Sequence, residues 1–371
     1  MPELRKKVLL VSALPPPNGG VASWTQTILD NGLPNNFVTA LVNTRMPTGR
    51  RLFDSEWNPL REAKRLFAIL FELARAIAVE KPDVIHVNSS MAKRGIFRDL
   101  ACVLIGRASR RPVVVQYRGD VGQFMLENPR GFQKRVMRLM AHLATRNVVL
   151  NSSSRELLRT FMRNGDGPPL LIVNYIDDSV VRNAVAVPGR MSGRPRILFV
   201  GGLAREKGTY DTLELAKRIP EADFVLVGCP SRDLALPSDL PTNFIQRGEL
   251  TRAQTFEEFS AAHIFLFPSY SEGFPNAVLE AMAAGLPVVA STAGAIPDMV
   301  LESGGMLLPP GDVDGFTGSI RKLLGDAELR TSYGEFNRSR VLTTYLYSRV
   351  SKELTDIYES VMPACGTQAE G

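Results

Sequence analysis

Two glutamates, Glu272 and Glu280, stand eight residues apart in a stretch that predicts a ligand-binding loop. An apolar strand is expected over residues 264–267. The loop after it carries Gly273, where a ligand can approach the backbone closely, and Pro275, whose fixed φ suits the first turn of a helix. Carboxylates accept hydrogen bonds from hydroxyls, and free N–H groups at a helix N-terminus attract an anion. A ligand with hydroxyl groups on both sides of a diphosphate would fit these groups, and a nucleotide sugar is such a ligand.

The position of this stretch supports that interpretation, because two glutamates on a helix face are often only solvated charges. Glu272 follows the carboxyl end of a predicted strand, where open α/β sheets bind their ligands. Gly285 is expected to end the helix in a left-handed conformation, and Pro287 prevents its continuation. A second buried strand is predicted over 288–290.

The run from Phe267 to Ala290 closely resembles the signature of the retaining glycosyltransferases of family 4, or glycosyl transferases group 1, which have the two-domain GT-B fold. The resemblance implies that Glu272 contacts the donor sugar and that Glu280 holds the nucleotide ribose. The donor-binding residues between them would be Gly273, Phe274, Pro275 and Asn276.

Two more glycine-bearing turns follow predicted strands and lead into helices. Gly19 and Gly20 form the first, and by the resemblance they lie beside the donor phosphates. The second resembles the family motif G-R-L-x-x-x-K-G, in which Lys207 matches the lysine that binds the diphosphate. Gly202 occupies the position of the motif's arginine. Arg205 is then either its substitute or a solvent-exposed side chain.

A second departure from the family pattern occurs after the strand expected over 113–116. Many members have a His-Gly pair near the reacting sugar, where this chain has Arg118-Gly119. Arg118 could hold a phosphate or an acidic acceptor, or it could pair with Asp120. We therefore expect catalysis to involve Glu272, Lys207, Arg205 and Arg118.

Metal-ligand spacings are not apparent, since no Asp-x-Asp, His-x-x-His or cysteine pair stands in a suitable loop. The three cysteines are scattered, which fits a reducing cytoplasm better than a disulfide framework. We expect no metal and no other cofactor. In the GT-B family, helix dipoles and basic side chains replace a divalent ion.

Short β-branched runs alternate with helical patterns along the 371 residues, which predicts an α/β chain with two Rossmann-like halves. We expect an N-terminal acceptor-binding domain over 1–185 and a nucleotide-sugar-binding domain over 195–344, joined by a Pro/Gly-bearing linker around 184–194. By the resemblance, the halves face each other across a cleft, and a helix over 345–371 crosses back to the first domain.

Charge is divided unevenly between the halves. Residues 1–190 hold 28 Lys and Arg against 15 Asp and Glu, whereas residues 191–371 hold 16 against 23. The basic half suits an acidic acceptor or anionic lipid. A helix over 133–146 has an apolar face with Lys134, Arg135 and Arg138 around it, as in a helix lying on a membrane or a surface helix facing a core. No membrane-spanning segment is expected.

The sequence thus predicts a hexosyltransferase that moves a sugar with retention, from a UDP-sugar in preference to a GDP-sugar, to a glycan or lipid-linked acceptor in polysaccharide or glycolipid synthesis. It would be cytoplasmic, with peripheral contact to the inner face of the membrane through the basic domain. One alternative is a nucleotide-sugar epimerase or phosphorylase of the same fold. The other is a basic nucleic-acid-binding protein, which is disfavoured because basic and aromatic residues are not interleaved on one element.

Overall fold

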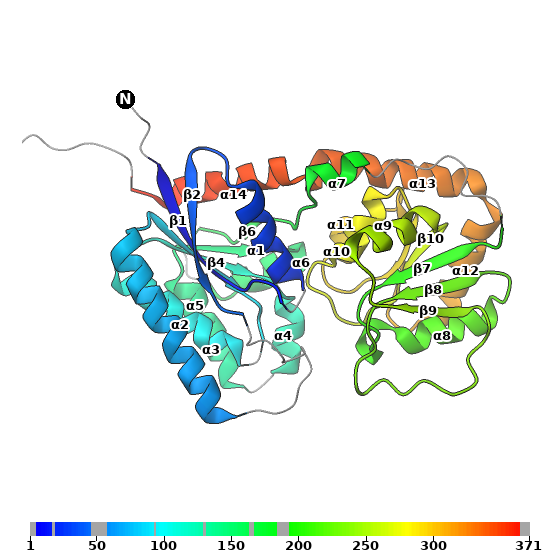
Figure 1. Ribbon diagram of the computed structural model, residues 1–371, viewed down its shortest axis with the longest axis horizontal. Coiled ribbons are helices and arrows are strands. Elements are labelled where there is room, and N and C mark those ends of the chain that lie inside the picture. Colours follow the sequence, from blue (N-terminus) through cyan, green and yellow to red (C-terminus); the bar gives the residue numbers. More distant parts are fainter. Residues whose placement is uncertain are drawn as a thin grey trace, which may run out of the picture. The chain divides into compact units, whose positions relative to one another are not determined.

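The computed structural model describes residues 5–16, 19–45, 58–92, 94–128, 131–162, 167–183 and 193–363. The chain divides into two compact units (Figure 1). Unit 1 comprises Met1–Val173 and Ser348–Gly371, and unit 2 comprises Asn174–Tyr347. Each unit has a six-stranded parallel sheet with helices packed on it, so the predicted α/β class with two Rossmann-like halves is confirmed.

The sheet of unit 1 has the strand order β2-β1-β3-β4-β5-β6. Its central strands are runs of Val, Ile and Leu with almost no exposed surface, as expected when helices cover both faces of a parallel sheet. The strands are β1 (Lys6–Ser12), β2 (Phe37–Asn43), β3 (Val84–Ser89), β4 (Val113–Tyr117), β5 (Arg146–Val149) and β6 (Leu170–Leu171). The helices are α1 (Gly20–Asn31), α2 (Pro59–Glu80), α3 (Gly95–Ala108), α4 (Val121–Glu127), α5 (Phe132–Leu143), α6 (Ser152–Arg159) and most of α14 (Tyr347–Val361).

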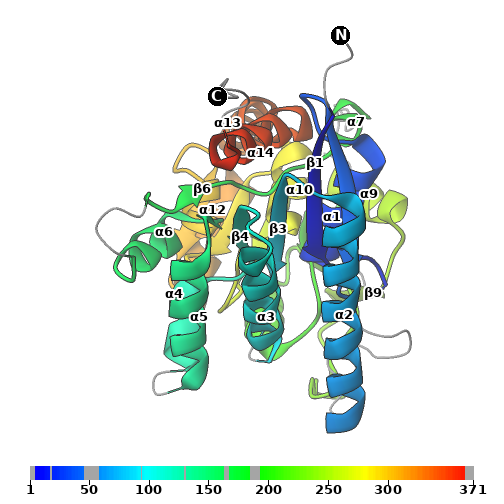
Figure 2. The ribbon, with the colours of Figure 1, turned by 90° about the vertical axis from the view of Figure 1, so that its left-hand side faces the viewer.

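Helices α2, α3 and α5 lie side by side and share one hydrophobic core with the sheet (Figure 2). Leu73 of α2, Val103 of α3 and Met137 of α5 are each fully buried in that core. The inner faces of these helices are therefore explained by packing within unit 1.

The long C-terminal helix belongs to unit 1, as predicted, although the chain passes through unit 2 before reaching it. Its Tyr358 is fully buried, and the Tyr358 hydroxyl lies 2.6 Å from Nδ1 of His86 in β3. Lys6 of β1 forms an ion pair with Glu359 at 2.5 Å. The helix starts at Tyr347, two residues later than expected, because a π-helical turn, η2 (Val341–Tyr345), precedes it.

The sheet of unit 2 has the strand order β12-β11-β10-β7-β8-β9. Its strands are β7 (Arg196–Val200), β8 (Asp223–Val227), β9 (Phe244–Gly248), β10 (Ile264–Phe267), β11 (Val288–Ser291) and β12 (Gly305–Leu308). Its helices are α7 (Asp178–Asn183), the short 3-10 helix η1 (Arg205–Lys207), α8 (Thr209–Arg218), α9 (Arg252–Ala261), α10 (Asn276–Ala283), α11 (Ile296–Met299), α12 (Val313–Gly325) and α13 (Ala327–Arg340).

The change of unit falls between Val173 and Asn174, upstream of the linker expected around 184–194. Asn174 donates a hydrogen bond to the Phe274 carbonyl, and Ile176 pairs with Leu346 as an isolated bridge. These contacts assign residues 174–183 to unit 2, whereas the sequence assigned them to the first domain. Residues 184–192 of the expected linker lie outside the described residues.

Candidate active site

Two loops of unit 2, at the carboxyl ends of β7 and β10, are joined by hydrogen bonds to one carbonyl group. The Glu206 carbonyl in η1 accepts from the Tyr270 backbone N–H at 2.9 Å and from the Ser269 hydroxyl at 3.2 Å. Gly208 ends η1 with φ +74°, and a Cβ there would lie 2.3 Å from the Pro268 carbonyl oxygen. Only glycine allows both this conformation and this approach. The two loops are thus held at a fixed separation.

This separation brings Lys207 to Glu272, the first of the two predicted glutamates. Lys207 Nζ lies 2.7 Å from Glu272 Oε1 and 3.4 Å from the Ser271 carbonyl oxygen. The Glu272 side chain is 9% exposed and the Lys207 side chain 30% exposed, so water screens the pair only partly. The structure therefore unites two predicted catalytic residues that come from separate loops.

A third loop, after β11, fixes the backbone on the other side of Glu272. Gly294 has φ +57°, and a Cβ there would lie 1.9 Å from the Glu272 carbonyl oxygen. The Ala295 N–H donates to the Gly273 carbonyl at 3.0 Å. The predicted site residues did not include Gly294, because the sequence does not show which backbone a glycine in this turn approaches.

Helix α10 presents its N-terminus directly after this loop. Pro275 is the residue before the helix rather than its first residue, and no side chain caps the first N–H groups. These groups can therefore receive an anion. Gly285, with φ +69°, follows the helix as predicted.

Phe274 and Asn276, both expected to bind the donor, make structural contacts within unit 2. The Phe274 ring is 7% exposed and packs against Tyr345 at a centroid distance of 6.0 Å. Asn174 Nδ2 donates to the Phe274 carbonyl at 3.2 Å and to Asn276 Oδ1 at 2.9 Å. The side chains of these two residues thus support the loop that presents Glu272.

Glu280, the second predicted glutamate, is partly buried on α10. Burial raises the pKa of its carboxyl group from 4.5 to about 7, and the positive charge of Arg252 opposes that shift. A hydroxyl that donated hydrogen bonds to the ionised carboxylate would lower this pKa again. The side chain can therefore exchange a proton for a hydroxyl-bearing ligand.

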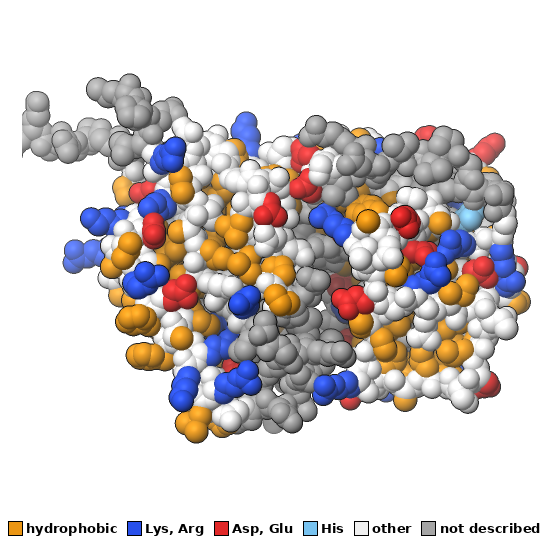
Figure 3. Space-filling view, in the orientation of Figure 1, with side chains coloured by type: hydrophobic (Ala, Val, Ile, Leu, Met, Phe, Trp, Pro, Cys, Tyr) orange, Lys and Arg blue, Asp and Glu red, His pale blue; other side chains and the backbone are white. Residues whose placement is uncertain are grey.

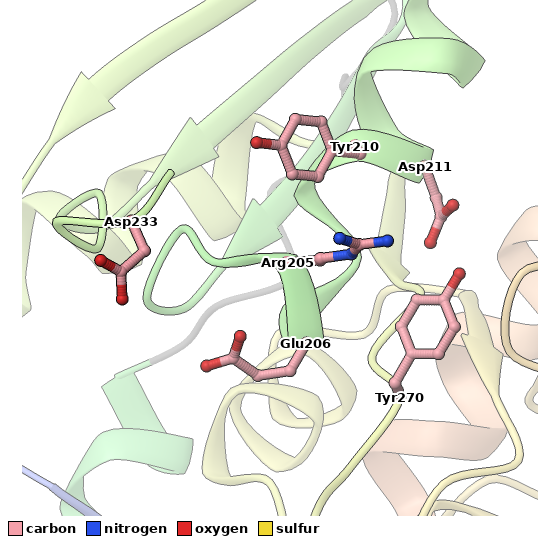
Figure 4. A pocket seen from close by; sticks show the side chains of 6 residues that line it. All are labelled: Arg205, Glu206, Tyr210, Asp211, Asp233 and Tyr270. Atoms are coloured by element: carbon pink, nitrogen blue, oxygen red, sulfur yellow. The ribbon is translucent and has the colours of Figure 1, made fainter. Parts of the chain in front are cut away.

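Arg205 lies on η1 with Lys207 but lines a different pocket (Figure 4). The volume of the pocket is about 730 Å³, and its lining residues are Arg205, Glu206, Tyr210, Asp211, Asp233 and Tyr270. Three acidic residues and one arginine line this pocket, a charge balance that is unfavourable for a diphosphate. Gly202 is exposed, and a Cβ there would meet no atom within 4 Å. The turn therefore has open space at the position where the family motif has its arginine.

In unit 1, Gly19 and Gly20 stand at the start of α1. Gly19 has φ −179°, an extended conformation that any residue adopts, and a Cβ on either glycine would meet no atom within 4 Å. The described neighbours thus give no packing reason for glycine here. The close approach of a ligand would give one.

Arg118 follows β4 and is 8% exposed. Its guanidinium lies 5.0 Å from the centre of the Trp24 ring, within cation–π range, and Trp24 meets His86 edge-on at 5.5 Å. Burial and the nearby Arg118 charge lower the pKa of His86 to about 3. Asp120, the other partner considered for Arg118, accepts a hydrogen bond from the Gln123 N–H and caps α4. Trp24 was not identified from the sequence, since nothing in it relates α1 to β4.

Comparison with known families agrees with the site in unit 2. The sequence model of the glycosyl transferases group 1 matches residues 194–326. The matched segment lies within unit 2. The match covers η1, the loop that carries Glu272, and all of α10.

Two relatives and one solved structure extend the comparison. A sulfoquinovosyl transferase of Arabidopsis thaliana is 33% identical over 39% of this chain, and the matched segment spans only 29% of that relative. A GDP-mannose-dependent phosphatidylinositol monomannoside mannosyltransferase of Corynebacterium glutamicum is 22% identical over 96% of this chain and 98% of its own. The structure of Anabaena Alr3699/HepE in complex with UDP matches with a TM-score of 0.70 at 16% identity, over 96% of this chain and 100% of the other.

The structural similarity supports the GT-B fold, and the sequence matches support a glycosyltransferase enzyme of the hexosyltransferase class. No helix in the described part of the chain has the length and apolar character needed to cross a membrane.

Proposed function

We propose that the chain transfers a hexose, with retention of configuration, from a nucleotide diphosphate sugar to a glycan or lipid-linked acceptor in polysaccharide or glycolipid synthesis. The Lys207–Glu272 ion pair carries this proposal, because it sets a cation and a carboxylate side by side just before the uncapped N-terminus of α10. The lysine and the helix N–H groups can bind a diphosphate, and the carboxylate can accept hydrogen bonds from the hydroxyls of a sugar.

In the proposed mechanism, Lys207 and the N–H groups of α10 stabilise the charge that grows on the departing diphosphate. Binding of the diphosphate to Lys207 would free an oxygen of Glu272 to accept a hydroxyl of the donor sugar. The bond from the anomeric carbon to the phosphate oxygen breaks as the acceptor oxygen bonds to that carbon. The acceptor's proton passes to the departing phosphate on the same face. No metal ion and no other cofactor is required in this scheme.

The donor's base is open to experiment. The Corynebacterium relative is GDP-mannose-dependent, whereas the Anabaena structure contains UDP. Glu280 would hold the ribose of either nucleotide, and our preference for UDP over GDP stays a prediction. Gly202, Gly273 and Pro275 would lie along the donor, and Arg205 becomes a weaker candidate because of the carboxylates around it.

Unit 1 would supply the acceptor site, with Arg118 at the carboxyl edge of its sheet, whereas Gly19 and Gly20 would lie beside the donor phosphates. The excess of Lys and Arg over Asp and Glu in residues 1–190 suits an acidic or lipid-linked acceptor. We propose a cytoplasmic enzyme that contacts the inner face of the membrane peripherally and does not bind nucleic acid.

A donor screen tests the proposal. Thermal shift with UDP- and GDP-sugars selects a donor, because ligand binding raises the melting temperature by mass action. The selected donor is then incubated with acceptor lipids or glycans, and nucleoside diphosphate and glycosylated product are measured. Product and nucleoside diphosphate in equal amounts support transfer. Donor isomerised without release would show an epimerase, and cleavage that depends on inorganic phosphate would show a phosphorylase.

A further inference from the structure

The outward side of α2, α3 and α5 carries mainly apolar and basic side chains. The acidic side chains that these described helices partly expose are Glu62, Glu72 and Glu80 of α2, and the Glu80 side chain is 40% exposed. We call this surface the three-helix face. Its exposed large apolar residues are Leu60, Phe67, Phe71, Val79, Phe97, Leu104, Phe132 and Leu139. Its exposed cations are Arg61, Lys64, Arg75, Arg107, Arg135 and Arg138.

Helix α2 is apolar on both sides. Ile69 and Leu73 are buried against the sheet, yet Phe67 is 73% exposed and Phe71 is 64% exposed on the outward side. Two of the acidic residues of α2 do not break that side, since Glu62 bonds Arg65 and Glu80 bonds Lys7. Figure 3 shows hydrophobic and basic side chains, with some acidic ones among them, over the part of unit 1 that carries α2. The two exposed phenylalanines therefore form an apolar strip among charged residues on the solvent side of α2.

An exposed aromatic pair connects the next two helices. The rings of Phe97 in α3 and Phe132 in α5 stack with centroids 5.8 Å apart, and Phe132 is 64% exposed. In α5, Val136 and Met140 face the core of unit 1, so they are unavailable to a membrane. The apolar residues that α5 offers outward are instead Phe132 and Leu139.

We infer that the three-helix face inserts its aromatic side chains into the surface of an anionic lipid bilayer. Aromatic residues suit the boundary between head groups and acyl chains, and Lys and Arg can extend along it to reach phosphates. The exposed cations of this face outnumber its partly exposed carboxylates, which suits a negative surface, and each cation near such a surface adds to the attraction.

This inference rests on the proposed peripheral contact with the membrane and makes it more specific. Electrostatic attraction alone disappears as salt shortens the Debye length. Burial of apolar surface does not depend on charge, so inserted phenylalanines should leave a part of the binding that resists salt. Vesicle binding requires no donor, acceptor or turnover. A protein that transfers sugar but does not bind vesicles would therefore contradict only this inference, and a protein that binds vesicles but transfers no sugar would contradict only the proposed function.

The test is co-sedimentation of the full chain with phosphatidylglycerol-containing and pure phosphatidylcholine vesicles over a range of salt. The variant Phe67→Ser/Phe71→Ser removes apolar contacts, and Lys64→Gln/Arg135→Gln removes charge. Leu342→Ser in unit 2, where Leu342 is 45% exposed, is the matched control. We expect the phenylalanine variant to lose at least about tenfold in affinity at every salt concentration, as two large apolar groups should give. The charge variant should lose affinity mainly at low salt, and the control should bind as wild type.

Absence of wild-type binding to phosphatidylglycerol vesicles would overturn the inference. So would unchanged binding of the phenylalanine variant, because the contact would then be electrostatic only. Sedimentation velocity without lipid excludes another occupant: a wild-type dimer that the phenylalanine variant turns into a monomer would show that a second copy covers this face. Circular dichroism and the release of nucleoside diphosphate confirm that each variant is folded.

Discussion

The two units share one architecture but differ at the carboxyl ends of their strands. In unit 2 these ends are loops tied to each other through backbone groups, as the Glu206 carbonyl and Gly294 show. In unit 1 they are joined by buried side chains: Asn88 Nδ2 donates to the Ser12 hydroxyl at 3.0 Å, and that hydroxyl lies 2.5 Å from the Thr25 hydroxyl.

The difference shows two ways to hold a polar edge in place. Unit 2 holds its loops in place through backbone contacts, so the side chains of Glu272, Glu280 and Lys207 are not needed to tie the strand ends together. Unit 1 commits these polar side chains to each other, although the buried Asn88 Oδ1 has no hydrogen-bond partner among the described residues. Variants of unit 2 should therefore affect catalysis, and variants of the unit 1 network should affect stability.

The largest effect is expected from Glu272→Gln. The amide keeps the shape but loses the charge that would hold the donor sugar in the transition state, so kcat should fall by about 100- to 1000-fold. Nucleoside diphosphate affinity, measured by calorimetry, should change little. An equal loss of rate and of UDP or GDP affinity would contradict a role at the sugar.

Lys207→Met should reduce transfer by about 100-fold, because one of the groups that neutralise the diphosphate is lost. The apolar replacement also leaves Glu272 without its partner, so the melting temperature must be measured alongside. EDTA should not alter the wild-type rate. Activity that EDTA abolishes and magnesium or manganese restores would disprove a metal-free reaction.

Glu280→Ala should weaken binding of UDP or GDP itself. Loss of a charged acceptor for ribose hydroxyls is expected to cost about 1 to 3 kcal/mol. Titration calorimetry on the folded variant measures this directly. Wild-type affinity would show that the ribose lies elsewhere.

The raised pKa of Glu280 gives a pH dependence with a defined sign. Below pH 4.5 the carboxyl group is protonated in both folded and unfolded chains. Between pH 4.5 and about 7 the unfolded chain ionises first, so the stability of unit 2 should fall as pH rises through this window. Glu280→Gln should flatten that fall, by about 3 kcal/mol at most. As pH increases through 7, nucleotide affinity should increase more in wild type than in Glu280→Gln. The phosphates of the nucleotide titrate equally in both experiments, so their contribution cancels in the comparison. Parallel profiles would refute the linkage.

The smallest effect is expected in unit 1. Tyr358→Phe removes the hydroxyl beside His86 Nδ1 and should destabilise unit 1 by about 1 to 2 kcal/mol, with donor binding unchanged. The depressed pKa of His86 implies further loss of stability as pH falls from 6.5 towards 3, since only the unfolded chain takes up the proton. Denaturant unfolding at pH 7 and pH 5 measures both. If Tyr358→Phe lost nucleotide affinity rather than stability, the proposed difference between a structural network in unit 1 and a catalytic site in unit 2 would be wrong.

The features that could be predicted from the sequence are those with a local signal. The predicted strands of both sheets are found, because β-branched runs bounded by glycine and proline are local signals. Strand β6 has only two residues, since the chain then leaves the sheet for contacts in unit 2. Lys207 and Glu272 could be paired because their loops follow strands of one sheet.

Other features depended on packing that no local pattern records. The partners of Arg118, the pocket around Arg205 and the burial of Tyr358 on His86 join residues that are distant in sequence. The apolar pattern of α5 located the helix but did not distinguish its core side from its outward side. Exposure of Phe67, Phe71 and Phe132 becomes visible only when neighbouring helices are in place.

The return of α14 to unit 1 has a consequence for how the protein is made. A ribosome delivers all six strands of the first sheet early, but Tyr358 emerges only after unit 2 has been synthesised. Until then His86 and Phe37, which both contact Tyr358, lack their cover. Unit 2 is continuous and can complete its core first. The segment translated first is therefore the last to reach its native state, and it is the part of the nascent chain most in need of protection from aggregation.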